Sequence, residues 1–303
     1  MLTQAVEEYV AMRRATGFAF RSEGSLLQSF AAFSDAAGKQ YVRTETAIEW
    51  ARCAPSLSQR ARRLGQVIRF ARYIRAEDPH HEIPPTVFGS ENRPRPVPYI
   101  FSKEEIQRIL QAASALGKRN VFRGHTYNTF FSLLACTGLR VSEAIHLRFE
   151  DITADGLVIR CSKFRKSRLV PLHETAQIAL ERYVKMRRAY TPLDDHVFVS
   201  LRRRALLLHD AETAFHDVVE KVGIPRGDGL PRPTIHSLRH TFAVRALETC
   251  PDGRDRITKH MLALSTYLGH SKVADTYWYL EATPDLMRQI ADVCQQFFTG
   301  GRP

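Results

Sequence analysis

The chain has 303 residues, which is enough for two domains, and 44% of them are hydrophobic, which is enough to build real cores. Its 44 lysines and arginines exceed its 32 acidic residues by 12, so a polyanionic partner is expected, either nucleic acid or an acidic membrane surface. A membrane is the less favoured of the two because no run approaches the roughly 20 apolar residues of a spanning helix. Residues 1–10 also lack the layout of a signal peptide, so a cytoplasmic location is expected.

Residues 1–90 predict a small helical domain. Apolar residues recur at helical spacing in four segments, within residues 2–10, 26–33, 47–51 and 64–73. The fourth segment carries six arginines between positions 60 and 75 and no acidic residue. A solvated basic face is one interpretation, and contact with nucleic-acid phosphates is the one we favour. The arginines expected to bind are Arg60, Arg62, Arg69, Arg72 and Arg75, of which the last four share one half of the helix.

A linker is predicted next. Six prolines, which cannot continue a helix, occur between positions 78 and 98. The R-P-R-P core, with Arg93 and Arg95, is expected to be extended and basic, which suits a segment that crosses a nucleic-acid groove. We therefore place the domain boundaries at 1–90, 91–98 (linker) and 99–303.

The second domain is predicted to be mainly helical with a small β-hairpin, an α+β fold. Ser102 and Glu105 form a capping box before a helix at 103–115. Gly138 ends a helix that begins near 126, and Arg140 opens the next one. The β-rich stretches 157–161 and 168–172 predict a hairpin with Lys163 at its tip. Further helices are expected at 174–188, 210–222, 234–242, 261–268, 272–280 and 284–298, with a short strand at 196–200 and a basic cluster that includes Arg202 and Arg203.

Several kinds of site are not indicated. The five cysteines are scattered and form no C-x-x-C pair. His236 and His240 have the spacing of a zinc pair, but the glutamate of H-E-x-x-H is missing and Arg239 lies between them. Nucleotide-binding glycine loops and the G-x-S-x-G elbow are also absent. The sequence therefore predicts neither a metal nor a nucleotide cofactor.

The remaining polar residues suit phosphoryl transfer with a tyrosine nucleophile. A phenol has a pKa near 10, so it needs a base and a positive setting to attack at neutral pH. His236, Arg239 and His240 share one helix face. Guanidiniums can clamp a phosphate bidentately, histidines can take the phenol proton or bind the phosphate, and a lysine can protonate the departing 5′ oxygen. The arginines then stabilise the developing negative charge, as a metal ion would in other phosphoryl-transfer enzymes.

Four separated motifs carry a resemblance to a known family. They are A-C-T-G-L-R-V-S-E-A at 135–144, Lys163 ahead of R-L-V-P-L, H-S-L-R-H at 236–240, and L-G-H-S at 268–271 with Tyr279 nine residues after His270. Together they resemble the tyrosine recombinases of the phage integrase family, in particular Xer-like and mobile-element integrases. The resemblance to the catalytic domain covers residues 99–295. The helical unit and linker are similar to the core-binding (SAM-like) domain of these enzymes.

The resemblance implies a catalytic set, which is Arg140, Lys163, His236, Arg239, His270 and Tyr279. In the family, the two arginines clamp the scissile phosphate and the lysine protonates the leaving 5′ oxygen. The first histidine assists proton transfer from the nucleophile, and the second bonds the phosphate. The tyrosine forms a 3′-phosphotyrosyl link, and neither metal nor ATP is required.

Some positions have rivals. Tyr267, Tyr277 and Trp278 also lie near the expected place of the nucleophile, but only Tyr279 stands nine residues after the histidine. Lys166 competes with Lys163, which the family pattern favours, and Lys166 is then expected to contact DNA. Phe164 stands where the family commonly has a small residue. Glu143 is expected to be a structural partner near Arg140.

The function implied is site-specific DNA strand exchange of the integrase or transposase type. Members of the family close two domains around duplex DNA and work as tetramers on two sites, in some cases with a second recombinase or an accessory protein. One alternative is a type IB topoisomerase-like enzyme that nicks and reseals one duplex. Another is a non-catalytic DNA-binding protein of the same fold. All three predict DNA binding that weakens steeply with salt. A cytoplasmic, nucleoid-associated location without a membrane partner is expected.

Overall fold

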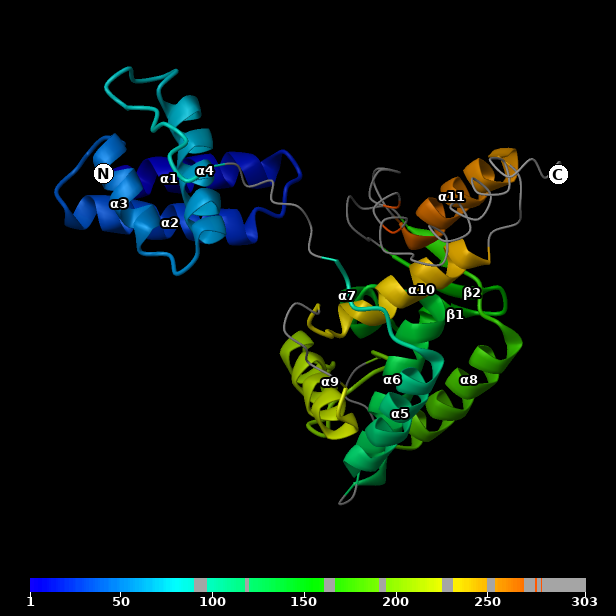
Figure 1. Ribbon diagram of the computed structural model, residues 1–303. Coiled ribbons are helices and arrows are strands. Elements are labelled where there is room, and N and C mark those ends of the chain that lie inside the picture. The colour runs from blue at the N-terminus through cyan, green and yellow to red at the C-terminus, as the bar shows by residue number, and fades with distance from the viewer. Residues whose placement is uncertain are drawn as a thin grey trace, which may run out of the picture. The chain divides into compact units, whose positions relative to one another are not determined.

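The computed structural model describes residues 1–89, 97–117, 120–160, 167–190, 195–224, 231–249 and 254–269, together with Thr276 and Tyr279. The chain divides into two compact units, Met1–Arg95 and Pro96–Pro303 (Figure 1). Each unit has its own hydrophobic core and is described by itself. Among the described residues, no helix has the combination of length and apolar character needed to cross a membrane.

The described residues of the first unit form four helices, which confirms the predicted number and order. They are α1 (Leu2–Ala15), α2 (Arg21–Ala36), α3 (Thr44–Arg52) and α4 (Leu57–Ile74). Their apolar faces meet in one core in which Phe30 packs edge-on against Trp50 with ring centroids 5.5 Å apart. Helix α4 begins at Ser56, whose side chain accepts a hydrogen bond from the Gln59 amide.

Helix α4 buries apolar side chains on one face and exposes arginines on the other. Leu64, Val67 and Ile68 are buried, whereas Arg62, Arg69, Arg72 and Arg75 are exposed. Arg60 is half-buried, and its Nε donates a 2.8 Å hydrogen bond to the carbonyl of Ala54. Arg60 therefore has a structural contact inside the domain, while the other four predicted arginines reach solvent.

The second unit is built from helices with a small antiparallel sheet. The helices are α5 (Lys103–Ser114), α6 (Val121–Thr137), α7 (Val141–Ile145), α8 (Glu174–Ala189), α9 (Leu208–Val222), α10 (His236–Glu248) and α11 (Arg254–Leu268). Two 3-10 turns are also present: Ala115–Gly117 lies between α5 and α6, and Phe149–Asp151 lies between α7 and the sheet. Strands β1 (Ile152–Thr153), β2 (Gly156–Ile159) and β3 (Arg168–Val170) pair in the order β1-β2-β3, with Ile159 opposite Arg168. The predicted mainly helical fold with a small sheet is confirmed.

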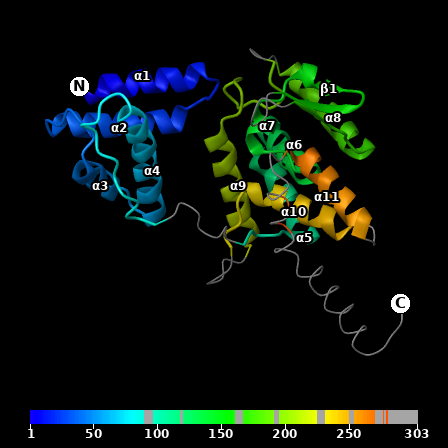
Figure 2. The ribbon, with the colours of Figure 1, turned by 90° about the horizontal axis from the view of Figure 1, so that it is seen from above.

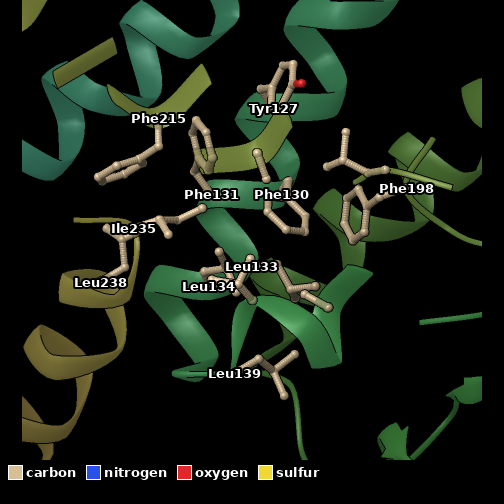
Figure 3. Packing of buried hydrophobic residues seen from close by; sticks show 14 of the residues in the cluster. Tyr127, Phe130, Phe131, Leu133, Leu134, Leu139, Phe198, Phe215, Ile235 and Leu238 are labelled. Atoms are coloured by element: carbon tan, nitrogen blue, oxygen red, sulfur yellow. The ribbon is translucent and has the colours of Figure 1, made fainter. Parts of the chain in front are cut away.

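Helix α6 lies at the centre of this unit and packs against α5, α8 and α10 (Figures 1 and 2). Phe130, Phe131 and Leu134 are completely buried (Figure 3). The Phe131 ring meets the ring of Phe215, from α9, edge-on at 5.2 Å. Because most of α6 is buried between its neighbouring helices, it supplies the rigid support from which the polar residues at its C-terminal end are positioned.

Some sequence expectations differ from the structure. The strand predicted at 196–200 is replaced by two isolated bridges, Arg148↔His196 and Val199↔Ala205, because the segment changes partner before a ladder can form. Its residues Val197 and Phe198 are completely buried, which accounts for their strand-like composition. The short strand β1 was not predicted. The linker core, the hairpin turn at 161–166 and the helix predicted at 284–298 lie outside the described residues, as does the helix predicted at 272–280 apart from Thr276 and Tyr279.

Candidate active site

The C-terminal end of α11 is held by three arginines from three different parts of the chain. Arg168 of β3 donates from Nε to the carbonyl of Tyr267 at 2.7 Å. Arg239 of α10 donates from Nη2 to the carbonyl of Leu268 at 2.7 Å, and Arg140 donates from Nη2 to the carbonyl of Gly269 at 3.0 Å. The last carbonyls of a helix have no partner within the helix and carry partial negative charge, so cations stabilise them. The backbone immediately before His270 is thereby fixed.

Glycine is required at position 269. Its φ of +66° lies in the left-handed region. A Cβ at this position would also stand 2.9 Å from Nη1 of Arg168. The glycine thus lets the guanidinium of Arg168 approach the end of α11.

Arg239 is the most deeply buried of the three arginines, with 2% of its surface exposed. Its Nη1 donates a 2.6 Å hydrogen bond to the carbonyl of Gly138, the left-handed residue that ends α6. Burial first, and then the neighbouring charge of Arg140, lower the pKa of Arg239 to about 10, so it stays charged at neutral pH. Arg239 therefore joins the ends of α6 and α11 around one buried positive charge.

Glu143 organises the other two arginines. Its carboxylate accepts two hydrogen bonds from Arg168, at 2.9 and 2.8 Å, in the bidentate arrangement typical of guanidinium and carboxylate. It also accepts hydrogen bonds from Nη1 (2.8 Å) and from the backbone amide (2.9 Å) of Arg140. Burial raises the pKa of Glu143, but the hydrogen bonds from Arg168 and Arg140 outweigh burial and bring the pKa to about 2. The expected partnership of Glu143 with Arg140 is present in the structure.

A stability test follows from the depressed pKa of Glu143. A carboxyl that titrates near 2 in the folded chain and near 4.5 when unfolded stabilises the fold fully above pH 4.5, and this contribution is lost as the pH falls toward 2. The shift corresponds to about 3 kcal/mol. Urea unfolding between pH 5 and pH 2.5 should show a shallower loss of stability in Glu143→Gln than in the wild type. Equal slopes would contradict the assignment.

The two histidines of α10 contact each other, and one of them, His240, also contacts Tyr279. The ring of His236 meets the ring of His240 edge-on, with centroids 4.6 Å apart and planes at 87°. Nδ1 of His240 lies 3.3 Å from Oη of Tyr279. The charge of Tyr279 also contributes to the pKa of Arg239, so the phenol lies within electrostatic range of that guanidinium. The predicted nucleophile and its polar neighbours are therefore gathered in one site.

His236 keeps contact with solvent although protein surrounds much of its ring. Desolvation by this protein, followed by the positive charges of Arg239 and Arg140, lowers the pKa of His236. Both effects favour the uncharged imidazole. His236 is consequently neutral at pH 7.

Tyr279 is buried, with 3% of its surface exposed, among apolar side chains of α10 and α11 such as Val244 and Leu268. Its amide donates a 3.0 Å hydrogen bond to the carbonyl of Thr276. Tyr267, one of its rivals, stacks on Phe242 at 5.5 Å, and burial is the main cause that raises its pKa to about 12. A role in packing suits Tyr267.

Four of the six predicted catalytic residues, Arg140, His236, Arg239 and Tyr279, thus come together, and Lys163 and His270 lie outside the described residues. Sequence reasoning did not single out Arg168. Arg168 could have been noticed as a charged residue in a predicted strand of apolar neighbours, because a buried charge requires a partner. His240 was noted as part of a shared helix face but received no catalytic role. Tyr277, Trp278 and Lys166 also lie outside the described residues.

The predicted DNA contacts are distributed over both units. Arg202 and Arg203 are exposed in the turn before α9. Arg93 and Arg95 lie outside the described residues. Within the part of the chain that the structure describes, no cluster of three or more histidine, cysteine, aspartate or glutamate residues could hold a metal ion.

Known proteins match this chain along most of its length. The sequence model of the phage integrase family matches residues 100–285. "Putative integrase/recombinase y4rB" of Sinorhizobium fredii (strain NBRC 101917 / NGR234) is 39% identical over 297 residues, 94% of each chain. Tyrosine recombinase XerD of Caulobacter vibrioides is 30% identical over 243 residues, which cover 76% of this chain and 72% of the relative.

A solved structure shares the fold. The XerH site-specific recombinase bound to palindromic difH substrate aligns with a TM-score of 0.68 at 16% identity, over 97% of this chain and 85% of that one. Together with the sequence matches, the fold and site define a tyrosine recombinase. The chain belongs to the phage integrase family.

Proposed function

We propose that this protein is a site-specific DNA recombinase that cuts and rejoins DNA through a 3′-phosphotyrosyl intermediate. The observation that carries the proposal is the convergence of Tyr279 and His240 with two buried or half-buried arginines, Arg239 and Arg140, in a chain of this family. A buried phenol beside an imidazole and fixed positive charge has what a tyrosine nucleophile requires.

The chemistry is a transesterification. Oη of Tyr279 forms a bond to the scissile phosphorus, and the bond from phosphorus to the 5′ oxygen breaks. Arg140, whose side chain is 24% exposed, and Arg239 stabilise the charge that develops on the non-bridging oxygens. We assign protonation of the leaving 5′ oxygen to Lys163 and a phosphate contact to His270, by their place in the family motifs. His236 assists beside the two arginines. The phosphotyrosine conserves the bond energy, so rejoining needs no ATP.

The same proposal includes the DNA partner and the role of each domain. Residues 1–90 form a core-binding domain, 91–98 a linker and 99–303 the catalytic domain. The related XerH recombinase was solved bound to its DNA substrate, and the charge of +12 suits the same kind of ligand. We propose a tetramer on two paired DNA sites, in which a second recombinase or an accessory protein can take part, and a cytoplasmic, nucleoid-associated location because the substrate is there.

The exposed arginines of α4 provide a test of DNA contact. Replacing Arg62 and Arg72 with glutamine should weaken binding to all sequences and lower the slope of log K against log salt concentration by about 2, roughly 0.9 for each phosphate that the protein no longer neutralises. Titrations of a labelled duplex at several salt concentrations measure this slope. Arg52→Gln, on an exposed site of α3 outside this face, is the control. An unchanged slope in the double variant would remove α4 from the DNA interface.

The proposed function is tested by trapping the intermediate. Rounds of binding to random duplexes first identify a site, and a nicked suicide duplex is then built from it so that the cleaved end diffuses away. A covalent protein-DNA adduct on a denaturing gel supports strand cleavage by the chain. Binding without any adduct would indicate a non-catalytic DNA-binding protein.

Two further readouts separate recombination from topoisomerase action. Strand exchange between two differently labelled sites, with a complex that contains both, supports recombination. Relaxation of supercoiled DNA without pairing of sites would instead indicate a topoisomerase-like enzyme.

A further inference from the structure

We propose that His240 is the catalytic residue that accepts the hydroxyl proton of Tyr279 when the tyrosine attacks. The inference rests on the proposed function and moves to His240 the uptake of the tyrosine proton, a role that the family resemblance implies for His236. It concerns the second imidazole of the H-S-L-R-H segment, at positions 236–240.

The contact itself is the first argument. Nδ1 of His240 lies 3.3 Å from Oη of Tyr279, and the two rings have centroids 5.5 Å apart. This is the reach at which a general base acts, and such contacts shorten in the reacting complex. His240 is held in place by helix α10, and the backbone amide of Tyr279 donates a hydrogen bond to the carbonyl of Thr276. The backbone of each partner therefore helps to position its side chain.

Burial of the nucleophile is the second argument. Tyr279 packs against Ala243, Val244 and Leu247 of α10 and is 3% exposed. Bulk water therefore has little access to the phenol, and the proton that leaves it must pass to a nearby protein group. His240 is on the same helix as the residues that bury the tyrosine, one position before Thr241, and is only half-buried. It can pass the proton on to solvent.

The position of His236 is the third argument. This imidazole is exposed and faces the positive charges of Arg239 and Arg140, which lower its affinity for a proton. A neutral imidazole within electrostatic range of two phosphate-binding arginines suits a hydrogen bond to the phosphate better than it suits holding a proton. We therefore assign proton uptake from Tyr279 to His240 and a hydrogen bond to the phosphate to His236.

The step is balanced. The Tyr279 O–H bond breaks, its proton moves to Nδ1 of His240, and the Oη lone pair forms the bond to phosphorus. The neutral His240 must carry its own proton on Nε2 at the start, and it becomes an imidazolium. The bond from phosphorus to the 5′ oxygen breaks, and the leaving oxygen takes a proton from its own acid, which we assign to Lys163. In the rejoining reaction His240 returns its proton to the phenolate.

The test compares two substrates that differ in one bridging atom. In a suicide duplex with a 5′-bridging phosphorothiolate, the leaving sulfur departs as a thiolate without protonation, because a thiol has a pKa near 8.5. A variant that lacks the leaving-group acid regains activity on this substrate, whereas a variant that lacks the base on the nucleophile does not. The variants are His240→Asn, which retains an acceptor oxygen near the Nδ1 position but cannot take up the proton, and His240→Gln. Lys163→Ala is the comparison for the other side of the reaction.

We expect both His240 variants to form the adduct roughly 10² to 10⁴ times more slowly than the wild type on ordinary DNA. The same defect should remain on the phosphorothiolate, while Lys163→Ala recovers. The ratio of the two rates in each variant does not depend on the fraction of folded protein, so partial unfolding cannot imitate the result. His125→Asn, on an exposed site of α6, should behave as the wild type.

Two outcomes would overturn the inference. One is a His240→Asn protein that cleaves ordinary DNA at the wild-type rate, and the other is a His240 defect that the phosphorothiolate repairs as it repairs Lys163→Ala. A wild-type protein that forms no adduct on either substrate contradicts the proposed function instead, which keeps the two failures distinct.

Discussion

Tyr279→Phe is expected to abolish the covalent protein-DNA adduct completely while the affinity for duplex DNA stays within about twofold of the wild type. The substitution removes one oxygen from a side chain that is 3% exposed, and the ring continues to pack against α10 and α11. In the proposed mechanism the phosphotyrosyl bond forms on the hydroxyl of Tyr279, so the loss should be total. Denaturing gels measure the adduct, and gel shifts at fixed salt concentration measure binding.

Tyr267→Phe is the matched control. Tyr267 is also close to the end of α11, but its ring stacks on Phe242 and its hydroxyl has a pKa of about 12 because of burial. Its phenylalanine variant should keep wild-type adduct formation. An adduct that persists in Tyr279→Phe and disappears in Tyr267→Phe would exchange the two assignments.

Arg168→Ala should have the largest combined effect on stability and activity. Arg168 forms a buried bidentate pair with Glu143 and also holds the carbonyl of Tyr267. Removal of one partner leaves a carboxylate of which 6% is exposed with less compensation, so a loss of about 3 kcal/mol is expected. Adduct formation should fall roughly 100-fold even in the folded fraction, because small displacements near the chemistry have effects of that size. Urea midpoints and single-turnover trapping measure the two effects.

The conservative variant separates charge from geometry. Arg168→Lys retains a positive charge beside Glu143 but cannot make the bidentate contact and reach Tyr267 at the same time. It should lie between the wild type and Arg168→Ala in both measurements. If Arg168→Ala matches the wild type in stability, the pair with Glu143 contributes nothing to the fold.

The features that could be predicted from the sequence are those that depend on residues close together in the chain. Helix α5 was predictable from its capping box, since Ser102 and Glu105 are three residues apart. The turn at Gly138 was predictable because glycine favours the left-handed backbone that ends a helix. Both signals are local and act through a few neighbouring residues.

The arrangement around α11 could not be predicted in the same way. Arg140 contacts Gly269 across 129 positions, and Arg168 contacts Tyr267 across 99. No periodicity records such pairings. The family motifs indicated the types of residue at the site but not which carbonyl each arginine binds, nor that His240 rather than another group meets Tyr279. These facts depend on how α10, α11 and β3 pack together.

The arginines at the end of α11 also set the charge balance of the site. Among the described residues there, three guanidiniums face one carboxylate, that of Glu143, which leaves two positive charges in excess. A phosphodiester brings one negative charge, and the pentacoordinate species formed by a deprotonated tyrosine carries two. In the proposed mechanism the site is therefore closest to electroneutrality at the transition state, so its fixed charge stabilises the transition state more than the bound substrate.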